Sequence, residues 1–270
     1  MGRYSHSKIS TFDQCRYKYK LAYIDMIRID GQSIESFMGS LVHSTLERLY
    51  KDLEHNNLNS KEDLVRHFLL AWSKEWNDKI TIVKKNFDVE YYKNLGLMFI
   101  MEYYDKYHPF NQLKTIDVET DEMLELDKNN KYYVKIDRLA VDENGNYHVI
   151  DYKTSSRIKN QTELDNDTQL AMYSYWVKNK FPDAKSIKLV WNFLAHNEER
   201  IVNKSDEELE KIKIDVENKI KEIEHCNEFP TNVSKLCDYC EYRPMCPEWK
   251  DQYKGEKPKY SKQKLLGEYI

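Results

Sequence analysis

Apolar residues recur at helical spacing along the first 110 positions of the chain. They predict three long helices, over residues 35–53, 60–76 and 88–107. The first helix has one apolar stripe, made of Met38, Val42, Leu46 and Leu49. Ser10 and Asp13 have the spacing of a capping box, with Asp in place of Glu, and predict that a short N-terminal helix begins there. The first part of the chain is therefore predicted to be a helical layer.

After residue 113 the pattern changes to short runs that are rich in β-branched and aromatic residues. Three consecutive strands are predicted, over residues 116–127, 131–142 and 147–154. Asn144-Gly145 is a turn signal that joins the last two of them as an antiparallel hairpin. Later in the chain, a strand is predicted over 186–195 and helices over 167–180 and 205–226. This order indicates an α/β protein with a mixed sheet and a helical N-terminal layer.

The composition is that of a soluble globular chain, with 40% hydrophobic and 33% charged residues. No apolar run approaches the ~18 residues that a membrane span needs, and the N-terminus lacks a secretory core. We therefore expect a cytoplasmic protein with no membrane contact. The net charge of −4 gives no global argument for nucleic-acid binding. It does not exclude DNA, because the acidic metal ligands of a phosphate-cleaving site also lower the net charge.

Acidic residues interrupt two neighbouring apolar runs, at Asp137 and at Asp151. Alternate residues of a strand share a face, so Asp151 and Lys153 point to the same side. If the predicted hairpin sets the register, Asp137 and Asp151 reach the same end of the sheet. Two carboxylates and the carbonyl oxygen of Tyr152 suit Mg²⁺ or Mn²⁺, which prefer oxygen ligands. Lys153 could position or deprotonate an attacking water and offset charge on a phosphate.

The same residues have a simpler interpretation. Asp137 with Arg138, and Asp151 with Lys153, could be ordinary ion pairs at strand ends, because a D-x-K triplet is common. The residues alone leave both alternatives open.

The chain has five cysteines, at positions 15, 226, 237, 240 and 246. An odd number, in a chain without a signal peptide, argues against a disulfide framework. Three of them form a C-x2-C-x5-C cluster after the last predicted helix, in a loop that also contains prolines, and Cys15 lies near the N-terminus. This spacing is compatible with a four-thiolate metal site, although the common zinc spacing of two C-x2-C pairs is not met.

The segment "IDRLAVDENGNYHVIDYKTSS" resembles the catalytic core of the PD-(D/E)xK nuclease superfamily, in particular its RecB-like branch. The chain departs from that branch at Lys135, near where a small Gly is often found. "GSLVHSTLERLY" is similar to the helix that supplies a histidine metal ligand, which implies that role for His43. "DTQLAMYSYW" resembles a Q-x-x-x-Y motif, which implies that Gln169 and Tyr173 line the active-site groove. Glu119 lies roughly where some members have an extra acid.

Each of these matches also has an interpretation without function. His43 lies beside the apolar stripe and could be a satisfied, partly buried histidine. Gln169 and Tyr173 could belong to a helix that is buried on all sides.

The cysteines resemble the iron–sulfur type of the same branch, which includes AddB-type and CRISPR-adaptation nucleases. The resemblance implies a [4Fe–4S] cluster bound by Cys15, Cys237, Cys240 and Cys246, with zinc in the same thiolates as the alternative. Such a cluster would join the two ends of the chain. Cys226 is expected to be a buried thiol without a metal.

The resemblance covers about residues 4–249 and implies a restriction-endonuclease-like fold in one nuclease domain, residues 1–270. Its parts would be a helical layer at 35–110, a catalytic core at 113–203, and two segments, 1–25 and 226–250, that the metal cluster holds together.

The implied activity is Mg²⁺- or Mn²⁺-dependent hydrolysis of DNA, as an exonuclease on single strands or duplex ends. The alternatives are a module that binds DNA ends without cutting, and a CRISPR-adaptation nuclease that trims spacer precursors with an integrase partner. The chain has no phosphate-binding G-x-x-x-x-G-K-[ST] motif, so a helicase partner would be a separate chain.

Overall fold

A five-stranded mixed sheet lies at the centre of the computed structural model, which describes residues 2–253 and 260–262. Its order is β11 (Glu198–Asn203), β10 (Ser186–Phe193), β9 (Asn146–Lys153), β8 (Arg138–Val141) and β5 (Lys114–Val118). β9 and β10 are parallel, and the other neighbouring pairs are antiparallel. The predicted β8–β9 hairpin is confirmed, and Gly145 has the positive φ of 81° that its turn requires.

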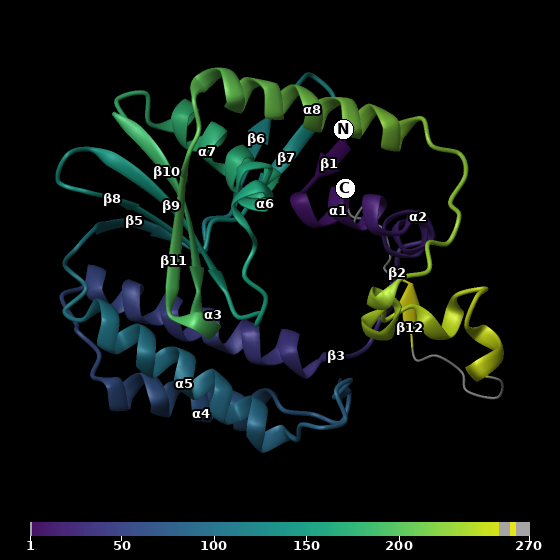
Figure 1. Cartoon of the computed structure of the whole chain (residues 1–270), viewed down its shortest axis with the longest axis horizontal. Helices are drawn as coiled ribbons and strands as arrows, with labels where there is room; N and C mark the ends of the chain where they lie inside the picture. Colours follow the sequence, from purple (N-terminus) through teal and green to yellow (C-terminus); the bar gives the residue numbers. More distant parts are fainter. Residues whose placement is uncertain (1, 254–259, 263–270) are drawn as a thin grey trace, which may run out of the picture.

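Helices cover both faces of this sheet (Figure 1). On one face lie α3 (Ile34–Glu54) and α5 (Val89–Tyr107), with α4 (Lys61–Glu75) packed against them. On the other lie α7 (Thr168–Lys180) and α8 (Asp206–Glu224). Because residues of β9 alternate between the faces, Ile150 and Tyr152 pack in the α3 core and Val149 in the α7 core. The mixed α/β architecture predicted from the sequence is confirmed.

The long helices begin where their side chains can cap the first turn. Ser60 and Asp63 form a capping box at α4, and Ser205 and Glu208 form another at α8. Each of the five predicted long helices agrees with the structure to within two residues at each end.

Two of the predicted strands are wrong, because each is divided between two sheets. The segment 116–127 becomes β5 and β6 (Glu122–Glu125), and the segment 131–142 becomes β7 (Asn130–Val134) and β8. β6 and β7 form a second sheet with β1 (Gly2–Tyr4). The chain bends at Glu119, whose φ is 51°, and its N–H donates to the Asp137 carbonyl oxygen at 3.0 Å. Asp137 therefore lies in a break between strands.

Two further expectations are corrected. The first helix does not begin at Ser10: α1 spans His6–Gln14, and the Ser5 hydroxyl caps it by accepting from the Lys8 N–H at 3.1 Å. The sequence also gave no indication of β11, because this edge strand is largely exposed and shows no apolar alternation.

The remaining elements are short. They are α2 (Arg16–Tyr19), the π-helix η1 (Lys20–Ile24), β2 (Ile27–Ile29), β3 (Gln32–Ser33), β4 (Ile80–Thr81), α6 (Gln161–Asp165), β12 (Tyr260–Lys262), and the 3₁₀ helices η2 (Leu194–His196), η3 (Lys235–Tyr239), η4 (Arg243–Met245) and η5 (Lys250–Tyr253). None of the helices in residues 2–253 has the length and apolar character needed to cross a bilayer.

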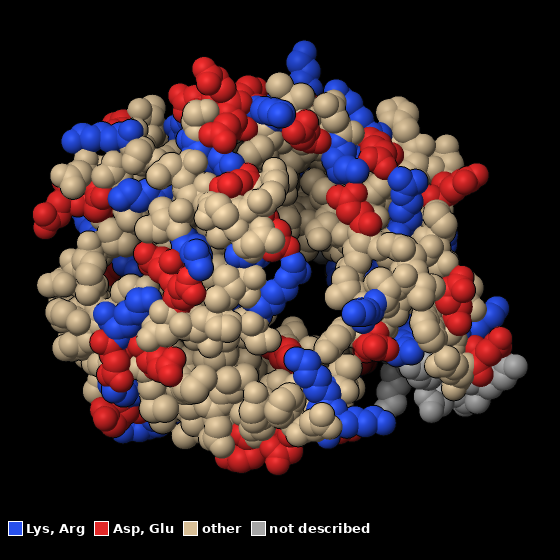
Figure 2. Space-filling view, in the orientation of Figure 1, with Lys and Arg blue, Asp and Glu red and all other residues tan. Residues whose placement is uncertain are grey.

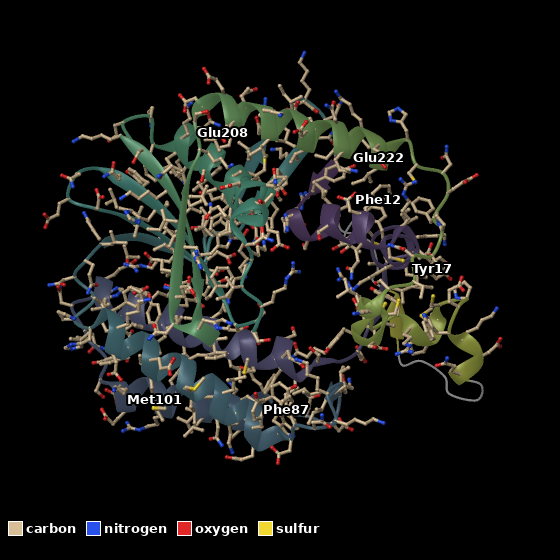
Figure 3. All side chains as sticks on the ribbon, viewed as in Figure 1. Phe12, Tyr17, Phe87, Met101, Glu208 and Glu222 are labelled. Atoms are coloured by element: carbon tan, nitrogen blue, oxygen red, sulfur yellow. The ribbon has the colours of Figure 1, made fainter. Side chains whose placement is uncertain are left out.

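The N-terminal segment and the cysteine-bearing segment pack together beside α1. Phe12 of α1, labelled in Figure 3, packs edge-on against Tyr19 at 5.2 Å, and Tyr19 stacks on Phe229 at 6.5 Å. The Tyr242 hydroxyl donates to the Ile27 carbonyl oxygen at 2.8 Å. The predicted cysteine-bearing loop thus lies against the N-terminal segment. It contains three short 3₁₀ helices. The predicted domain of residues 1–270 also includes residues 1, 254–259 and 263–270, which lie outside the described residues.

Gly96 lets α5 approach its neighbours closely, and this gives a stability prediction. A Cβ atom at Gly96 would lie 2.5 Å from Phe68 Cζ and 3.1 Å from Met38 Cγ. Both neighbours are almost completely buried, so they have little room to move. We expect Gly96→Val to lower the free energy of unfolding by about 1–3 kcal/mol, measured by urea titration. The exposed Asn94→Ala on the same helix is the control, and equal stability of the two variants would contradict the prediction.

Candidate active site

The break before β8 brings Asp137 to the end of β9. Arg138 pairs with Ile150 in the β8–β9 register, so Asp137 lies beside the Asp151–Tyr152 peptide. The Asp137 Oδ2 atom accepts a hydrogen bond from the Tyr152 N–H at 2.7 Å. The two carboxylates therefore lie at the same end of the sheet.

Asp151 and Lys153 share one face of β9 and form an ion pair. The Lys153 Nζ atom lies 2.6 Å from Asp151 Oδ2, and the Asp151 side chain is only 8% exposed. Burial raises the pKa of Asp151 to about 6, although the Lys153 ammonium opposes the shift. Burial lowers the pKa of Lys153, but the charge and hydrogen bond of Asp151, together with the charges of Asp137 and Asp167, outweigh it and the net shift is upward. Both groups are thus charged at neutral pH.

His43 reaches the same place from α3. Its Nε2 atom is 2.9 Å from the Tyr152 carbonyl oxygen, and its Nδ1 atom is 3.5 Å from Asp137 Oδ1 and 3.9 Å from Glu119 Oε1. Burial lowers the pKa of His43, but the charges of Asp137, Asp151 and Glu119 raise it to about 9. The histidine is thus held among three acids instead of packing as a neutral core residue.

These groups have the chemistry of a divalent-metal site. His43, Glu119 and Asp137 can each offer one ligand atom within 4.8 Å of the others. The Tyr152 carbonyl oxygen lies beside His43, whereas among the described residues the carboxylate of Asp151 does not come within the same 4.8 Å and instead pairs with Lys153. Carboxylate and carbonyl oxygens with one imidazole fit Mn²⁺ and Mg²⁺.

Glu119 is held in this group by its backbone and by Lys135. Its φ of 51° is unusual for a residue with a side chain, and its Oε2 atom lies 2.9 Å from Lys135 Nζ. Lys135, which the sequence marked as a departure from the resembling branch, thus pairs with Glu119.

A groove of about 630 Å³ opens in front of this group. His43, Glu119 and Asp137 line it, together with Gln169 and Tyr173 of α7. The Gln169 Nε2 atom donates to the Tyr173 hydroxyl at 3.4 Å, so the two side chains of the motif lie together as predicted for one helix face. Asp151 and Lys153 do not line the groove. Figure 2 shows the molecule hollowed at its centre on the face drawn.

The groove also contains residues that the sequence did not reveal. Ser5, His6 and Ser7 line it from the start of α1. The signal that could have found them is the Ser5 N-cap, which was missed when the helix was predicted to begin at Ser10.

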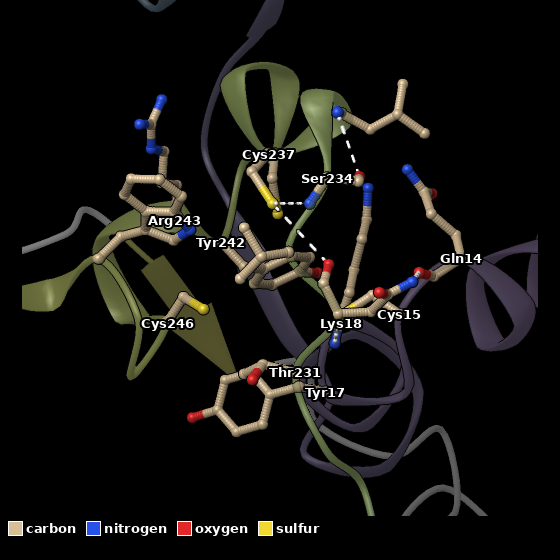
Figure 4. A pocket seen from close by; sticks show the side chains of 15 residues that line it. Gln14, Cys15, Tyr17, Lys18, Thr231, Ser234, Cys237, Tyr242, Arg243 and Cys246 are labelled. Atoms are coloured by element: carbon tan, nitrogen blue, oxygen red, sulfur yellow. Dashed lines mark hydrogen bonds between the residues drawn. The ribbon is translucent and has the colours of Figure 1, made fainter.

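The four cysteines of the predicted cluster site line one pocket (Figure 4). Cys15 Sγ accepts from the Lys18 N–H at 3.5 Å, and Cys237 Sγ accepts from the Ser234 N–H at 3.4 Å. Cys240 and Cys246 lie in the same pocket, beside Tyr242. Cys226 is not part of it, and its thiol donates to the Glu228 carbonyl oxygen at 3.0 Å.

Known proteins resemble this chain both in sequence and in structure. The family model of the PD-(D/E)XK nuclease superfamily matches residues 3–247. The solved structures similar to this chain include a candidate exonuclease from Eubacterium rectale, with 13% identity, 86% coverage of this chain, 91% coverage of that chain and a TM-score of 0.47. Another is the protein SSO0001, with 17% identity, 79% and 97% coverage and a TM-score of 0.37. No curated protein matches the chain.

Proposed function

We propose that this chain, which belongs to the PD-(D/E)XK nuclease superfamily, is a DNA exonuclease of the RecB-like branch that depends on Mg²⁺ or Mn²⁺. Nucleases of this superfamily use divalent metals and have the restriction-endonuclease-like fold, and the mixed α/β architecture agrees with that fold. Beyond family membership, the exonuclease type of cleavage, the DNA substrate and the roles of individual residues are what we propose.

One observation supports the proposal most strongly. The Tyr152 backbone contacts two groups from other elements, since its N–H donates to Asp137 and its carbonyl oxygen lies 2.9 Å from His43 Nε2. Three separate segments of the chain thus meet at the backbone of one residue, Tyr152, next to the buried Asp151–Lys153 pair. An ordinary pair of strand-end ion pairs would not need a histidine from α3 at the same point.

The proposed roles follow from this geometry. His43, Asp137, Asp151 and the Tyr152 carbonyl oxygen would hold the metal ion, with Glu119 as an additional acid. When bound, such an ion lowers the pKa of a coordinated water and polarises a phosphoryl oxygen. Lys153, charged at neutral pH, would orient the attacking water and offset the charge that develops on the phosphate. Gln169 and Tyr173 would contact the DNA backbone from the groove wall.

We also propose that Cys15, Cys237, Cys240 and Cys246 bind a [4Fe–4S] cluster that joins the chain ends within one nuclease domain, with zinc as the alternative. In a tetrahedral zinc site the sulfur atoms lie about 3.8 Å apart, from the Zn–S distance of about 2.3 Å. Within residues 2–253, no three of the four thiols come within 4.8 Å of one another. All four thiols nevertheless line one pocket, which supports a shared metal group there.

The exonuclease assignment predicts a difference between DNA molecules with and without ends. With Mn²⁺ or Mg²⁺ present, we expect linear single-stranded DNA to be degraded and circular single-stranded DNA of the same sequence to persist. EDTA should stop the reaction, because the carboxylate groups would then have no metal. Gel analysis of both substrates over time is the measurement. Equal degradation of the circle would identify an endonuclease, and binding without any degradation would support a non-cleaving DNA-binding module.

A further inference from the structure

A buried arginine lies directly behind the candidate metal centre. Arg138 is 5% exposed, and its guanidinium carbon lies 3.7 Å from the centroid of the Tyr50 ring. Its Nε atom donates to Thr115 Oγ1 at 3.0 Å, and its Nη2 atom donates to the Leu113 carbonyl oxygen at 3.4 Å. Among the residues that the structure describes, no carboxylate forms an ion pair with it. A buried charge without an acid partner is costly, so its neighbours must compensate for it.

Three buried tyrosines surround this arginine and are joined through their hydroxyls. The Tyr50 hydroxyl is 2.5 Å from that of Tyr103, and the Tyr103 hydroxyl is 3.1 Å from that of Tyr152. The Tyr103 ring also meets those of Tyr50 and Tyr152 edge-on. Burial raises the pKa of all three hydroxyls, so they stay neutral and act as dipoles, not as anions. Arg138, Tyr50, Tyr103 and Tyr152 are called the tyrosine–arginine cluster below.

Three members of the cluster lie on the elements that supply the proposed metal ligands. Arg138 is the residue after Asp137. Tyr50 lies seven positions after His43 on α3, which places both on the same side of that helix. Tyr152 points its side chain into the cluster, while its N–H and carbonyl oxygen contact Asp137 and His43. Tyr103 on α5 joins the hydroxyls of Tyr50 and Tyr152.

We propose that the tyrosine–arginine cluster is a positioning device, which holds Asp137, His43 and the Tyr152 carbonyl oxygen at the mutual distances that one metal ion requires. The inference rests on the proposed metal-dependent function. Its physical basis is that groups outside the ligand shell fix the orientation of the ligands, and that losing one such partner typically lowers metal affinity by about 10–100-fold. The side chains of the cluster do not line the groove, so they position the ligands and are not catalytic groups.

Tyr103→Phe is the most selective test, because it removes only the hydroxyl that joins Tyr50 to Tyr152. We expect the Kd for Mn²⁺ of the full chain to rise by about 10-fold, measured by isothermal titration calorimetry and by the Mn²⁺ EPR signal without DNA. The matched control is Tyr104→Phe on the same helix, whose hydroxyl donates to the Asn59 carbonyl oxygen, away from the cluster. The control should bind Mn²⁺ as the wild type does.

Arg138→Met and Arg138→Lys extend the test. We expect the Met variant to lose about 10–100-fold in Mn²⁺ affinity and the Lys variant to recover part of that loss, because it keeps the charge but not the planar contact with Tyr50. Wild-type affinity in the Tyr103→Phe variant would overturn the inference, and so would an equal loss in the Tyr104→Phe control. If Arg138→Met does not fold, the Tyr103→Phe result decides. Failure of the wild type to bind Mn²⁺ would instead overturn the metal assignment itself.

Discussion

The Lys153→Met variant should hydrolyse DNA about 10²–10⁴-fold more slowly than the wild type in the presence of Mn²⁺. Lys153 carries a charge at neutral pH and lies 2.6 Å from the buried carboxylate of Asp151. Methionine fills a similar volume, so the loss reports the missing charge and not a cavity. The measurement is single-turnover degradation of end-labelled single-stranded DNA, with circular dichroism to verify folding.

Asp151→Asn should reduce the rate at least as strongly, because it removes a proposed metal ligand as well as the partner of Lys153. Breaking a buried ion pair can destabilise the fold by about 3–5 kcal/mol, so the double variant Asp151→Asn with Lys153→Met separates stability from catalysis. The control is Lys188→Met on the neighbouring strand β10, whose ammonium pairs with Asp142 near the hairpin turn. Wild-type rates in the Lys153 and Asp151 variants would contradict the assignment of this site.

Cys237→Ser should abolish the visible absorption of anaerobically purified protein and lower its melting temperature by more than about 10 °C. A structural metal site can contribute about 10 kcal/mol or more to folding, and 1 kcal/mol shifts the melting temperature of a chain this size by about 2–4 °C. The pocket lies between the N-terminal segment and the loop after α8, so losing the cluster would release both from each other.

Cys226→Ser is the matched control for this experiment. Cys226 lies just before the cluster segment, outside the pocket, and its thiol donates to the Glu228 carbonyl oxygen and accepts from Arg16 at 3.9 Å. The control should keep both the absorption and the melting temperature. A colourless wild-type protein that contains stoichiometric zinc would replace the iron–sulfur assignment with the alternative, and equal behaviour of the two variants would contradict any metal in the pocket.

The helices and the neighbouring acids were predictable because their signals are local. An apolar stripe such as Met38, Val42 and Leu46 needs only helical geometry to define a buried face. The Asn144-Gly145 turn joins strands that are adjacent in sequence, so it predicted that Asp137 and Asp151 would meet, and the structure brings them to the same end of the sheet.

Other features depended on contacts between distant segments. The division of residues 116–127 and 131–142 between two sheets follows from the bend at Glu119, which is stabilised by a hydrogen bond to the Asp137 carbonyl oxygen. Edge strand β11 has too few buried positions to show a period. Nothing local in the sequence marks Tyr50, Tyr103 and Tyr152 as neighbours, since their hydroxyls meet only after α3, α5 and β9 have packed.

In the candidate site, too, some features could be predicted from the sequence and others depended on contacts between distant segments. Residue types and spacing made Asp137, Asp151 and Lys153 candidates, because metal binding and phosphate chemistry restrict which side chains can serve, and the resemblance to the nuclease superfamily added His43. Their mutual distances, the pairing of Glu119 with Lys135 and the buried arginine behind them follow from packing alone. A side chain's chemistry is encoded at its own position in the chain, whereas its distance from another side chain depends on every element that packs between them.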